Sequence, residues 1–258
     1  MSHRFVFIGA GNLATRLSLI LKENGFSVVQ VYSRTEESAR VLGQKLNTIY
    51  STEVEEIVSD ADIYFVALKD SAFEKVLPQI DFQNRLVVHC SGSMPLSCLE
   101  KYSKNIGVFY PLQTFSRHRK VEFSEIPVFI EASSLENEKN LIQIAEKISS
   151  QVSVLNSEKR LRLHISAVFA CNFVNYFYTV AGEVLNSNEI PFEVLYPLIA
   201  ETARKAQEMD PEQAQTGPAV RFDQNVISKH LAALEAFPEF QNLYRLVSES
   251  IFKFYQNR

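Results

Sequence analysis

The chain has 258 residues, of which 46% are hydrophobic, and its acidic and basic side chains leave a formal net charge of −4. This length allows one large domain or two modest ones with buried cores. A small negative net charge provides no broad positive field for nucleic acid or for an anionic membrane surface, so we expect neither as a partner.

The cysteines and the apolar stretches indicate the compartment. Cys90, Cys98 and Cys171 form neither a close pair nor a Cys/His cluster with zinc spacing, so we expect reduced thiols and no metal site. The apolar run at residues 5–8 is too short for a signal peptide. The run at residues 167–182 is interrupted by asparagines and is shorter than a membrane span. These features predict a soluble, cytoplasmic protein.

Up to residue 156, short apolar and β-branched runs alternate with amphipathic runs of helical period. Several of the short runs are continuously apolar, as is typical of parallel strands covered on both faces. The pattern predicts a Rossmann-like, doubly wound α/β domain with a mostly parallel sheet over residues 1–156. The expected strands are residues 5–8, 28–32, 48–50, 63–68, 86–89, 106–109, 128–131 and 152–155.

The first helix of this domain has a clear beginning and end. Its apolar residues follow helical spacing from Leu13 to Leu21, and Gly25 stands where a glycine commonly ends a helix. We therefore expect a strand, a glycine-rich turn and a helix within the first 25 residues.

After residue 156 the strand patterns stop, which predicts an all-α C-terminal domain over residues 157–258 for substrate binding and dimerisation. One long helix opens it, and Pro191 can begin a second helix in which Pro197 introduces a kink. Two further helical runs are separated by Pro238. The loop before them, "TGPAVRFD", contains Arg221, which could meet an anionic substrate, and Thr216; it also contains Asp223, which is expected to cap a helix.

The segment "GAGNLA" matches the dinucleotide-binding pattern G-x-G-x-x-G/A between the first strand and the first helix. Gly9 permits the tight turn, Gly11 lets the backbone approach a diphosphate, and Ala14 lets the helix pack closely on the strand. The diphosphate would bind the free amides at the start of the helix. The expected cofactor-binding residues here are Gly9, Ala10, Gly11, Asn12 and Leu13; the alternative is a tight turn without a ligand.

The end of the second strand selects between the two nicotinamide cofactors. An NAD site usually places a carboxylate there, whereas this chain has Ser33, Arg34 and Thr35. A 2′-phosphate between the arginine and the hydroxyl groups would form charge-assisted hydrogen bonds, which favours NADP(H). The alternative is a capping box formed by Ser33 and Glu36. That alternative leaves Arg34 unexplained, because a cation in the first turn opposes the helix dipole.

Three later loops follow strands at the edge where ligands of such sheets bind. After the fourth strand, Leu68 and Lys69 could pass along the cofactor, although Ser71 and Glu74 could equally form a capping box. The loops after the next two strands could be simple turns or could lie on the nicotinamide side of the cofactor. None of their residues forms a hydrolytic triad. They are His89, Ser91 and Gly92 in the first of these loops, and Tyr110, Gln113 and Thr114 in the second.

The long C-terminal helix carries one polar stripe. At a hundred degrees per residue, His164, Asn175 and, more loosely, Asn172 share a face. A histidine there could act as an acid or base at neutral pH, with Asn172 positioning the substrate. The alternative is a core histidine bonded to the backbone or lying in a subunit contact.

Several motifs together carry a resemblance over nearly the whole chain. They are "GAGNLA", "SRT", "HCSGS", "YPLQTF", "HISAVFACNFVN" and "TGPAVRFD". The chain resembles the NADP oxidoreductases labelled as deazaflavin-dependent-reductase-like, which pair a Rossmann-like domain with a helical domain. More distantly it is similar to pyrroline-5-carboxylate reductases and β-hydroxyacid dehydrogenases, whose helical domains commonly mediate dimerisation.

The resemblance implies a homodimer, places Gly9, Gly11, Asn12 and Leu13 in a phosphate loop, and places Ser33 and Arg34 at the 2′-phosphate. The β-hydroxyacid dehydrogenases carry a catalytic lysine with an asparagine one turn later on the long helix. Here His164 lies in that region, with Asn172 two turns on.

The sequence therefore predicts an NADP(H)-dependent oxidoreductase. Hydride would pass between nicotinamide and a small carbonyl, imine or hydroxyacid in an interdomain cleft. The alternative is a non-catalytic NADP(H)-binding sensor or regulatory module, because such a module needs the same glycine-rich loop and arginine.

Overall fold

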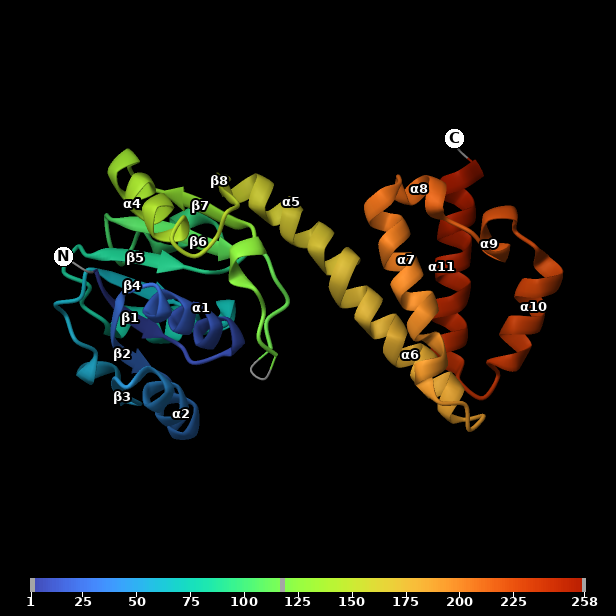
Figure 1. Cartoon of the computed structure of the whole chain (residues 1–258), viewed down its shortest axis with the longest axis horizontal. Coiled ribbons are helices and arrows are strands. Elements are labelled where there is room, and N and C mark those ends of the chain that lie inside the picture. Colours follow the sequence, from blue (N-terminus) through green and yellow to red (C-terminus); the bar gives the residue numbers. More distant parts are fainter. Residues whose placement is uncertain (1–2, 117–118, 257–258) are drawn as a thin grey trace. The chain divides into compact units, whose positions relative to one another are not determined.

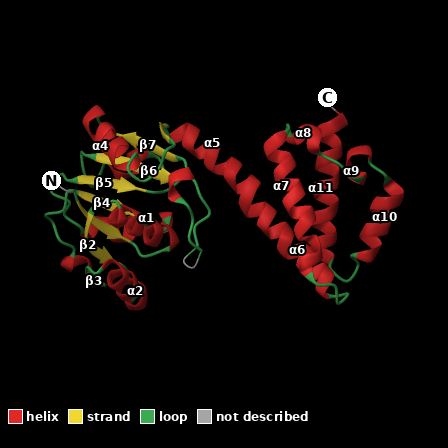
Figure 2. Cartoon of the chain, viewed as in Figure 1, coloured by secondary structure: helices red, strands yellow, loops and turns green. Residues whose placement is uncertain are grey.

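The computed structural model describes residues 3–116 and 119–256, and the chain divides into two compact units, Met1–Cys171 and Asn172–Arg258 (Figure 1). The first unit is a sheet covered by helices and the second is helical, as predicted (Figure 2). The division between the units falls inside a long helical segment. The functional boundary predicted after residue 156 stays a prediction.

All eight predicted strands are present, in the order β3-β2-β1-β4-β5-β6-β7-β8. Neighbouring strands are parallel, except that β6 and β7 pair antiparallel. The order reverses between β1 and β4, so the carboxyl ends of these strands flank the point where such sheets bind dinucleotides. The strands are β1 (Arg4–Ile8), β2 (Ser27–Tyr32), β3 (Ile49–Ser51), β4 (Ile63–Val66), β5 (Leu86–His89), β6 (Ile106–Pro111), β7 (Val128–Ala132) and β8 (Val152–Val154).

Apolar side chains alternate to the two faces of the sheet and form two separate cores. One face packs against α1 (Asn12–Glu23), α2 (Glu36–Leu46) and α4 (Leu135–Ala145). The other face is covered by α3 (Phe73–Val76) and by the 3₁₀ turns Leu77–Gln79 and Leu96–Leu99. Burial on both faces explains why the central strands are continuously apolar. Further 3₁₀ turns lie at Val54–Glu56, Asp70–Ala72 and Phe123–Glu125.

Helix α1 ends as the sequence predicts. Gly25 adopts a left-handed conformation with φ of 86°, and the amide of Phe26 donates to the Leu21 carbonyl at 3.1 Å. These features form a glycine-terminated helix end, which satisfies carbonyls of the last turn.

The long helical segment is continuous over Ser157–Asn186 but changes its pitch. It consists of α5 (Ser157–Ala167), a π-helical stretch Val168–Phe173 and α6 (Val174–Asn186). A π-helix has more residues per turn than an α-helix. Counting one hundred degrees per residue across this stretch is therefore wrong, and the single polar face predicted for this helix does not follow from the spacing.

The same segment corrects the prediction that this region is too short to span a membrane. Among the described residues, the helix Ser157–Asn186 is the one that is long and apolar enough to cross a bilayer by length and composition. It extends beyond the apolar stretch on both sides. Length and composition alone are weak evidence, and Asn172 and Asn175 place amide groups within the apolar stretch, where hydrocarbon would leave them without water.

The rest of the second unit is helical, and Pro238 separates two helices as predicted, as the first residue of α11. Asp223 caps α10 by accepting from the Val226 amide at 3.2 Å, which confirms the predicted cap. The predicted kink at Pro197 is wrong: residues Phe192–Leu195 form a 3₁₀ turn, so that proline lies in the first turn of α7, where its missing amide is tolerated. The helices are α7 (Tyr196–Glu208), α8 (Pro211–Ala214), α9 (Pro218–Arg221), α10 (Gln224–Ala233) and α11 (Pro238–Gln256).

Candidate functional site

The turn between β1 and α1 depends on a glycine at its first position. Gly9 has φ of 119°, and its amide donates to the Tyr32 carbonyl at 2.8 Å. A Cβ at Gly9 would lie 2.4 Å from the Ala67 carbonyl oxygen. No other residue fits this backbone without displacing the loop after β4. Gly9 thus brings the loops after β1 and β4 together at the carboxyl edge of the sheet.

Gly11 has a different role, because it precedes α1 in an extended conformation with φ of −76°. No described atom lies within 4 Å of a Cβ added there, and no described side chain caps the helix. The first turn of α1 contains no acidic residue, so its amides, including those of Asn12 and Leu13, can bind an anion. The geometry fits the diphosphate of a dinucleotide, which approaches on the side that Gly11 leaves open.

The loop after β6 is bonded to the same helix end. The Asn12 side-chain amide donates to the Phe115 carbonyl at 3.0 Å, and Arg16 Nε donates to the Ser116 carbonyl at 3.1 Å. The residues that follow β6 are therefore held beside the phosphate loop.

At the end of β2, Arg34 is exposed and lies before the N-cap of α2. The N-cap is Thr35, and Glu36 is the first residue of the helix, so the capping box considered for Ser33 and Glu36 does not form. Instead, the Ser33 hydroxyl accepts from the Thr35 amide at 3.4 Å. Arg34 stands immediately before the N-cap, so the prediction that it lies in the first turn of the helix is wrong. Its side chain is available to a ligand at the carboxyl end of β2.

The loop after β4 lies against the glycine-rich turn. The Leu68 side chain comes within 3.4 Å of the Cβ position of Gly9, and Lys69 is exposed at the start of the turn Asp70–Ala72. The capping box considered for Ser71 and Glu74 does not form, because Glu74 pairs with Lys101 at 2.5 Å.

His89, at the end of β5, is a structural residue. Its side chain is fully buried, and its Nδ1 accepts from the Ser91 amide at 3.1 Å. Burial and, to a smaller extent, the positive charge of Arg160 lower the pKa of His89 to about 3. His89 is therefore neutral at physiological pH and does not exchange protons there.

Two residues from different parts of the chain meet over Gly92. Tyr110 Oη, at the end of β6, lies 3.0 Å from His164 Nδ1 on α5, and the two rings are edge-to-face at 6.1 Å. A Cβ at Gly92 would lie 2.7 Å from the His164 ring and 2.9 Å from Tyr110 Cζ. Tyr110 is 7% exposed, whereas His164 is half-buried. The pair thus lies at the carboxyl edge of the sheet, with the histidine as its more accessible member.

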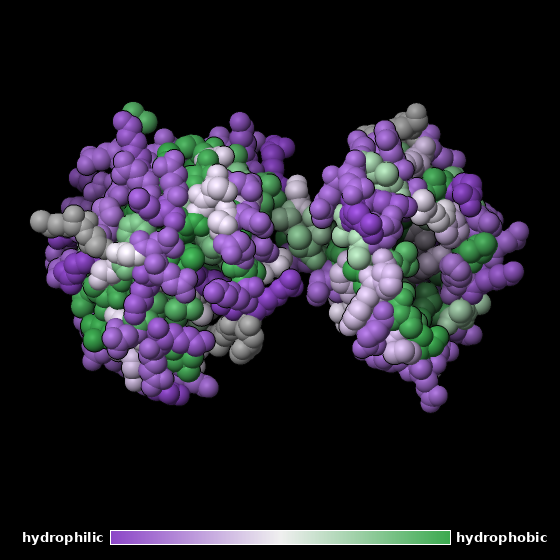
Figure 3. Space-filling model, viewed as in Figure 1, coloured by the Kyte–Doolittle hydropathy of each residue, from purple (hydrophilic) through white to green (hydrophobic). Residues whose placement is uncertain are grey.

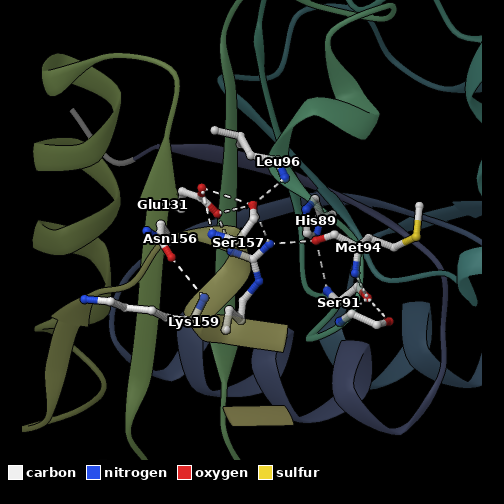
Figure 4. Close-up of polar contacts among 10 residues, drawn as sticks. His89, Ser91, Met94, Leu96, Glu131, Asn156, Ser157 and Lys159 are labelled. Carbon is white, nitrogen blue, oxygen red and sulfur yellow. Dashed lines mark hydrogen bonds and ion pairs between the residues drawn. The ribbon is translucent and has the colours of Figure 1, made fainter. Parts of the chain in front are cut away.

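A buried ion pair fixes the start of α5 against the sheet (Figure 4). Arg160 is 1% exposed; its guanidinium pairs with Glu131 of β7 and donates to the Met94 carbonyl at 2.6 Å. Ser157 joins the same group by donating to Glu131 at 2.8 Å, and it accepts from the Leu96 amide at 2.9 Å. This group holds α5 to the loop that carries Gly92.

This buried group was not predicted from the sequence. Arg160 lies four residues before His164, so the two side chains share a helix face, and that spacing was the available signal. Nothing in the sequence shows that an arginine in a charged segment is buried, because its partners come from residues 94 and 131.

The remaining predicted residues differ in their local surroundings. Asn172 lies exposed in the π-helical stretch and belongs to the second unit, so its positioning role stays a prediction. Gln113 accepts from the amide of its neighbour Thr114 at 2.7 Å. In the second unit, Thr216 lines a cavity of about 500 Å³ among apolar side chains, and Arg221 ends α9.

Two family descriptions match separate parts of the chain. Residues 4–92 match "NADP oxidoreductase coenzyme F420-dependent", and residues 126–251 match a domain of unknown function, DUF2520. No match was found among the curated proteins.

A crystal structure from Bacteroides fragilis, described provisionally as that of an NADP oxidoreductase, is 50% identical, with a TM-score of 0.94 over 98% of both chains. The chain belongs to this NADP oxidoreductase family. The assignment confirms the predicted family and the prediction of NADP(H) as the cofactor.

More distant structures share the fold. An imine reductase from Myxococcus stipitatus in complex with NADP⁺ is 16% identical, with a TM-score of 0.67 over 98% of this chain and 93% of that one. A pyrroline-5-carboxylate reductase from Coxiella burnetii is 18% identical, with a TM-score of 0.59 over 100% of this chain and 98% of that one. In this NADP oxidoreductase, as in those proteins, a Rossmann-like unit is followed by helices.

Proposed function

We propose that this oxidoreductase uses NADPH to reduce a small carbonyl or imine compound, or runs the reverse reaction on a hydroxyacid or amine. The observation that carries the proposal is the meeting of His164 and Tyr110 over Gly92, at the edge of the sheet that also bears the phosphate loop. The loop after β6 connects Tyr110 to residues bonded to the start of α1. A proton-transfer group and a dinucleotide site would then serve one reaction.

The cofactor would be held at three places along this edge. The amides around Gly9, Ala10, Gly11, Asn12 and Leu13 would bind the diphosphate; Ser33, Arg34 and Thr35 would bind the 2′-phosphate; Leu68 and Lys69 would lie along the nicotinamide half. When bound, NADPH supplies a hydride, while the protein supplies orientation and a proton.

His164 is the proposed proton donor to the substrate, with Asn172 as a positioning group. Two features support this role for the histidine. Its ring is half-buried rather than enclosed, and one of its nitrogens is already engaged by Tyr110. The other nitrogen can therefore serve the substrate.

We also propose that the chain acts as a cytoplasmic homodimer. Large apolar side chains along the helix Ser157–Asn186 are 39–63% exposed in the single chain, and the cavity of the helical unit is lined mainly by apolar residues. Figure 3 shows hydrophobic side chains within the hollow of that unit. Covering such surface against a second copy is favourable. The exposed apolar residues are Leu161, Ile165, Phe169, Phe173, Tyr176 and Phe177.

The proposal is tested by following NADPH oxidation with a panel of small cyclic imines, ketones and keto acids. Once a substrate is found, we expect His164→Ala to lower kcat by about 10²–10⁴-fold while the affinity for NADPH, measured by calorimetry, stays unchanged. The matched control is His230→Ala, because His230 also bonds a tyrosine, Tyr244, at 2.7 Å, but in the second unit. Tight NADPH binding without turnover on any class would contradict the enzymatic function.

A further inference from the structure

The direction of the hydrogen bond between Tyr110 and His164 decides which nitrogen of the imidazole carries the proton. Tyr110 Oη and His164 Nδ1 lie 3.0 Å apart, and either group could donate. In a neutral imidazole one nitrogen is a donor and the other an acceptor. The partner of one nitrogen therefore fixes what the other can do.

The surroundings of Tyr110 resolve the direction. The side chain is 7% exposed, and His164 Nδ1 is the one hydrogen-bond partner of its hydroxyl within the described residues. If the hydroxyl accepted from Nδ1–H, its own proton would face no acceptor among the described residues, on a side chain that is only 7% exposed to water, which is costly. If it donates to Nδ1, both groups are satisfied. The phenol is protonated at physiological pH, because burial raises the pKa of Tyr110.

We propose that Tyr110 and His164 form a proton relay in which His164 Nε2–H is the donor to the substrate and Tyr110 is the positioning residue behind it. This inference rests on the proposed reductase function. As hydride reaches the substrate carbon, the Nε2–H bond breaks and a bond to the substrate oxygen or nitrogen forms. The Tyr110 O–H bond breaks and an Nδ1–H bond forms, which leaves a phenolate. A proton taken from water restores the pair after product leaves.

The buried Arg160 supports the charge left on Tyr110. Arg160 lies four residues before His164 on α5, and its positive charge lowers the pKa of Tyr110, opposing the effect of burial. Glu131 and Met94 hold the guanidinium in place. Gly92 completes the arrangement, because any side chain there would occupy the space of the two rings.

The hydrogen bond is tested without a substrate by ¹⁵N NMR of histidine-labelled protein. The chain has five histidines, and His164→Gln identifies the resonances of His164. We expect the neutral His164 to carry its proton on Nε2 alone in the wild type and to populate both tautomers in Tyr110→Phe. The matched control is Tyr64→Phe, which removes another buried hydroxyl, bonded to the Val58 carbonyl at 2.7 Å. Tyr64→Phe should leave the tautomer of His164 unchanged, and it reveals any general effect of losing a buried hydroxyl on folding.

The relay itself is tested by kinetics with a turned-over substrate. We expect Tyr110→Phe to lower kcat by about tenfold or more with KM unchanged, since one hydrogen bond that acts in the transition state is lost. A plot of rate against deuterium content should be curved for the wild type, where two protons move together, and linear for Tyr110→Phe.

Two results would overturn the inference. A proton on Nδ1 of neutral His164, or a His164 spectrum that Tyr110→Phe leaves unchanged, would remove the relay whether or not a substrate is known. A kcat for Tyr110→Phe equal to that of Tyr64→Phe would do the same. Failure to find any NADPH-dependent turnover would contradict the proposed function and leave the NMR result to decide the hydrogen bond.

Discussion

At the residue scale, Arg34 is an exposed charged side chain at the proposed 2′-phosphate position. It is exposed, precedes α2 and lies at the carboxyl end of β2. We expect Arg34→Ala to weaken NADPH binding by about 10- to 100-fold through loss of charge-assisted bonds to the 2′-phosphate, and to leave NADH binding nearly unchanged. Calorimetry with both cofactors measures this difference. Arg40→Ala on α2 is the matched control, and equal losses for NADPH and NADH would refute the 2′-phosphate role.

In the turn between β1 and α1, we expect Gly9 to be needed for folding and Gly11 for cofactor binding. Ala at Gly9 would be strained at φ of 119° and would meet the Ala67 carbonyl, so we expect Gly9→Ala to lower the free energy of unfolding by at least about 1–3 kcal/mol. Gly11→Ala meets no described atom and should change stability by less than about 0.5 kcal/mol. It should nevertheless weaken NADP⁺ binding, because in the proposed site the added methyl group would face the diphosphate. Thermal unfolding and calorimetry on both variants check the contrast; unimpaired binding by Gly11→Ala would count against the site.

The lowered pKa of His89 predicts how the free energy of unfolding depends on pH. Its pKa of about 3 in the folded protein lies below the ordinary value of 6.5, so the unfolded chain takes up a proton first as pH falls. The stabilising contribution is complete above pH 6.5 and is lost progressively between pH 6.5 and about 3. We expect His89→Gln to flatten the fall in unfolding free energy over this window in urea titrations, while His230→Gln should not. An unchanged pH dependence in His89→Gln would contradict the assignment.

At the element scale, α5 is held against the sheet by an ion pair between two residues that are far apart in the sequence. Arg160 is 1% exposed and its partner Glu131 lies on β7. We expect Arg160→Met alone to lower the free energy of unfolding by about 3–5 kcal/mol, because it leaves a carboxylate nearly buried without a cation.

Replacing both members of this ion pair is the control. We expect the double variant Glu131→Gln with Arg160→Met to recover much of the lost stability, because no uncompensated charge remains. Urea denaturation of the two single variants and the double variant gives the coupling free energy between the two side chains. Additive losses would show that the two charges do not act together.

The residue pattern predicts some secondary-structure elements correctly and others wrongly. All eight strands were predicted, because burial on one or both faces leaves a direct mark on the residue pattern. The π-helical stretch Val168–Phe173 was not, since no residue in "VFACNF" breaks the helical pattern and the extra residue per turn is a matter of backbone hydrogen bonding. The start of α7 was misplaced for a similar reason, because a 3₁₀ turn and an α-helix share the same residue preferences.

At the scale of the whole molecule, the exposed apolar residues of the long helix predict self-association. We expect light scattering after gel filtration to give about twice the chain mass of 29.4 kDa. Phe169 is 63% exposed on this helix, and Phe169→Glu should shift the protein toward the monomer by placing a charge in a desolvated contact.

Arg162→Ala is the matched control for the dimer. Arg162 lies on the same helix and, among the described residues, its side chain pairs with Glu158 at an exposed site, so its removal should leave the mass unchanged. A monomeric wild type, or a protein recovered with membranes, would contradict the dimer.

The sequence by itself determined the two-part organisation, the strands of a mostly parallel Rossmann-like sheet, the glycine-rich turn and the choice of NADP(H). These follow from periodicity and from residues adjacent in the chain, where spacing translates directly into geometry. Only the tertiary structure decided that His89 is buried and neutral, and that His164 meets Tyr110 over Gly92 while Arg160 lies enclosed behind them. Residues 89–92, Tyr110 and residues 160–164 come from three separate parts of the chain, so whether a histidine can exchange a proton depends on neighbours that folding alone brings into contact.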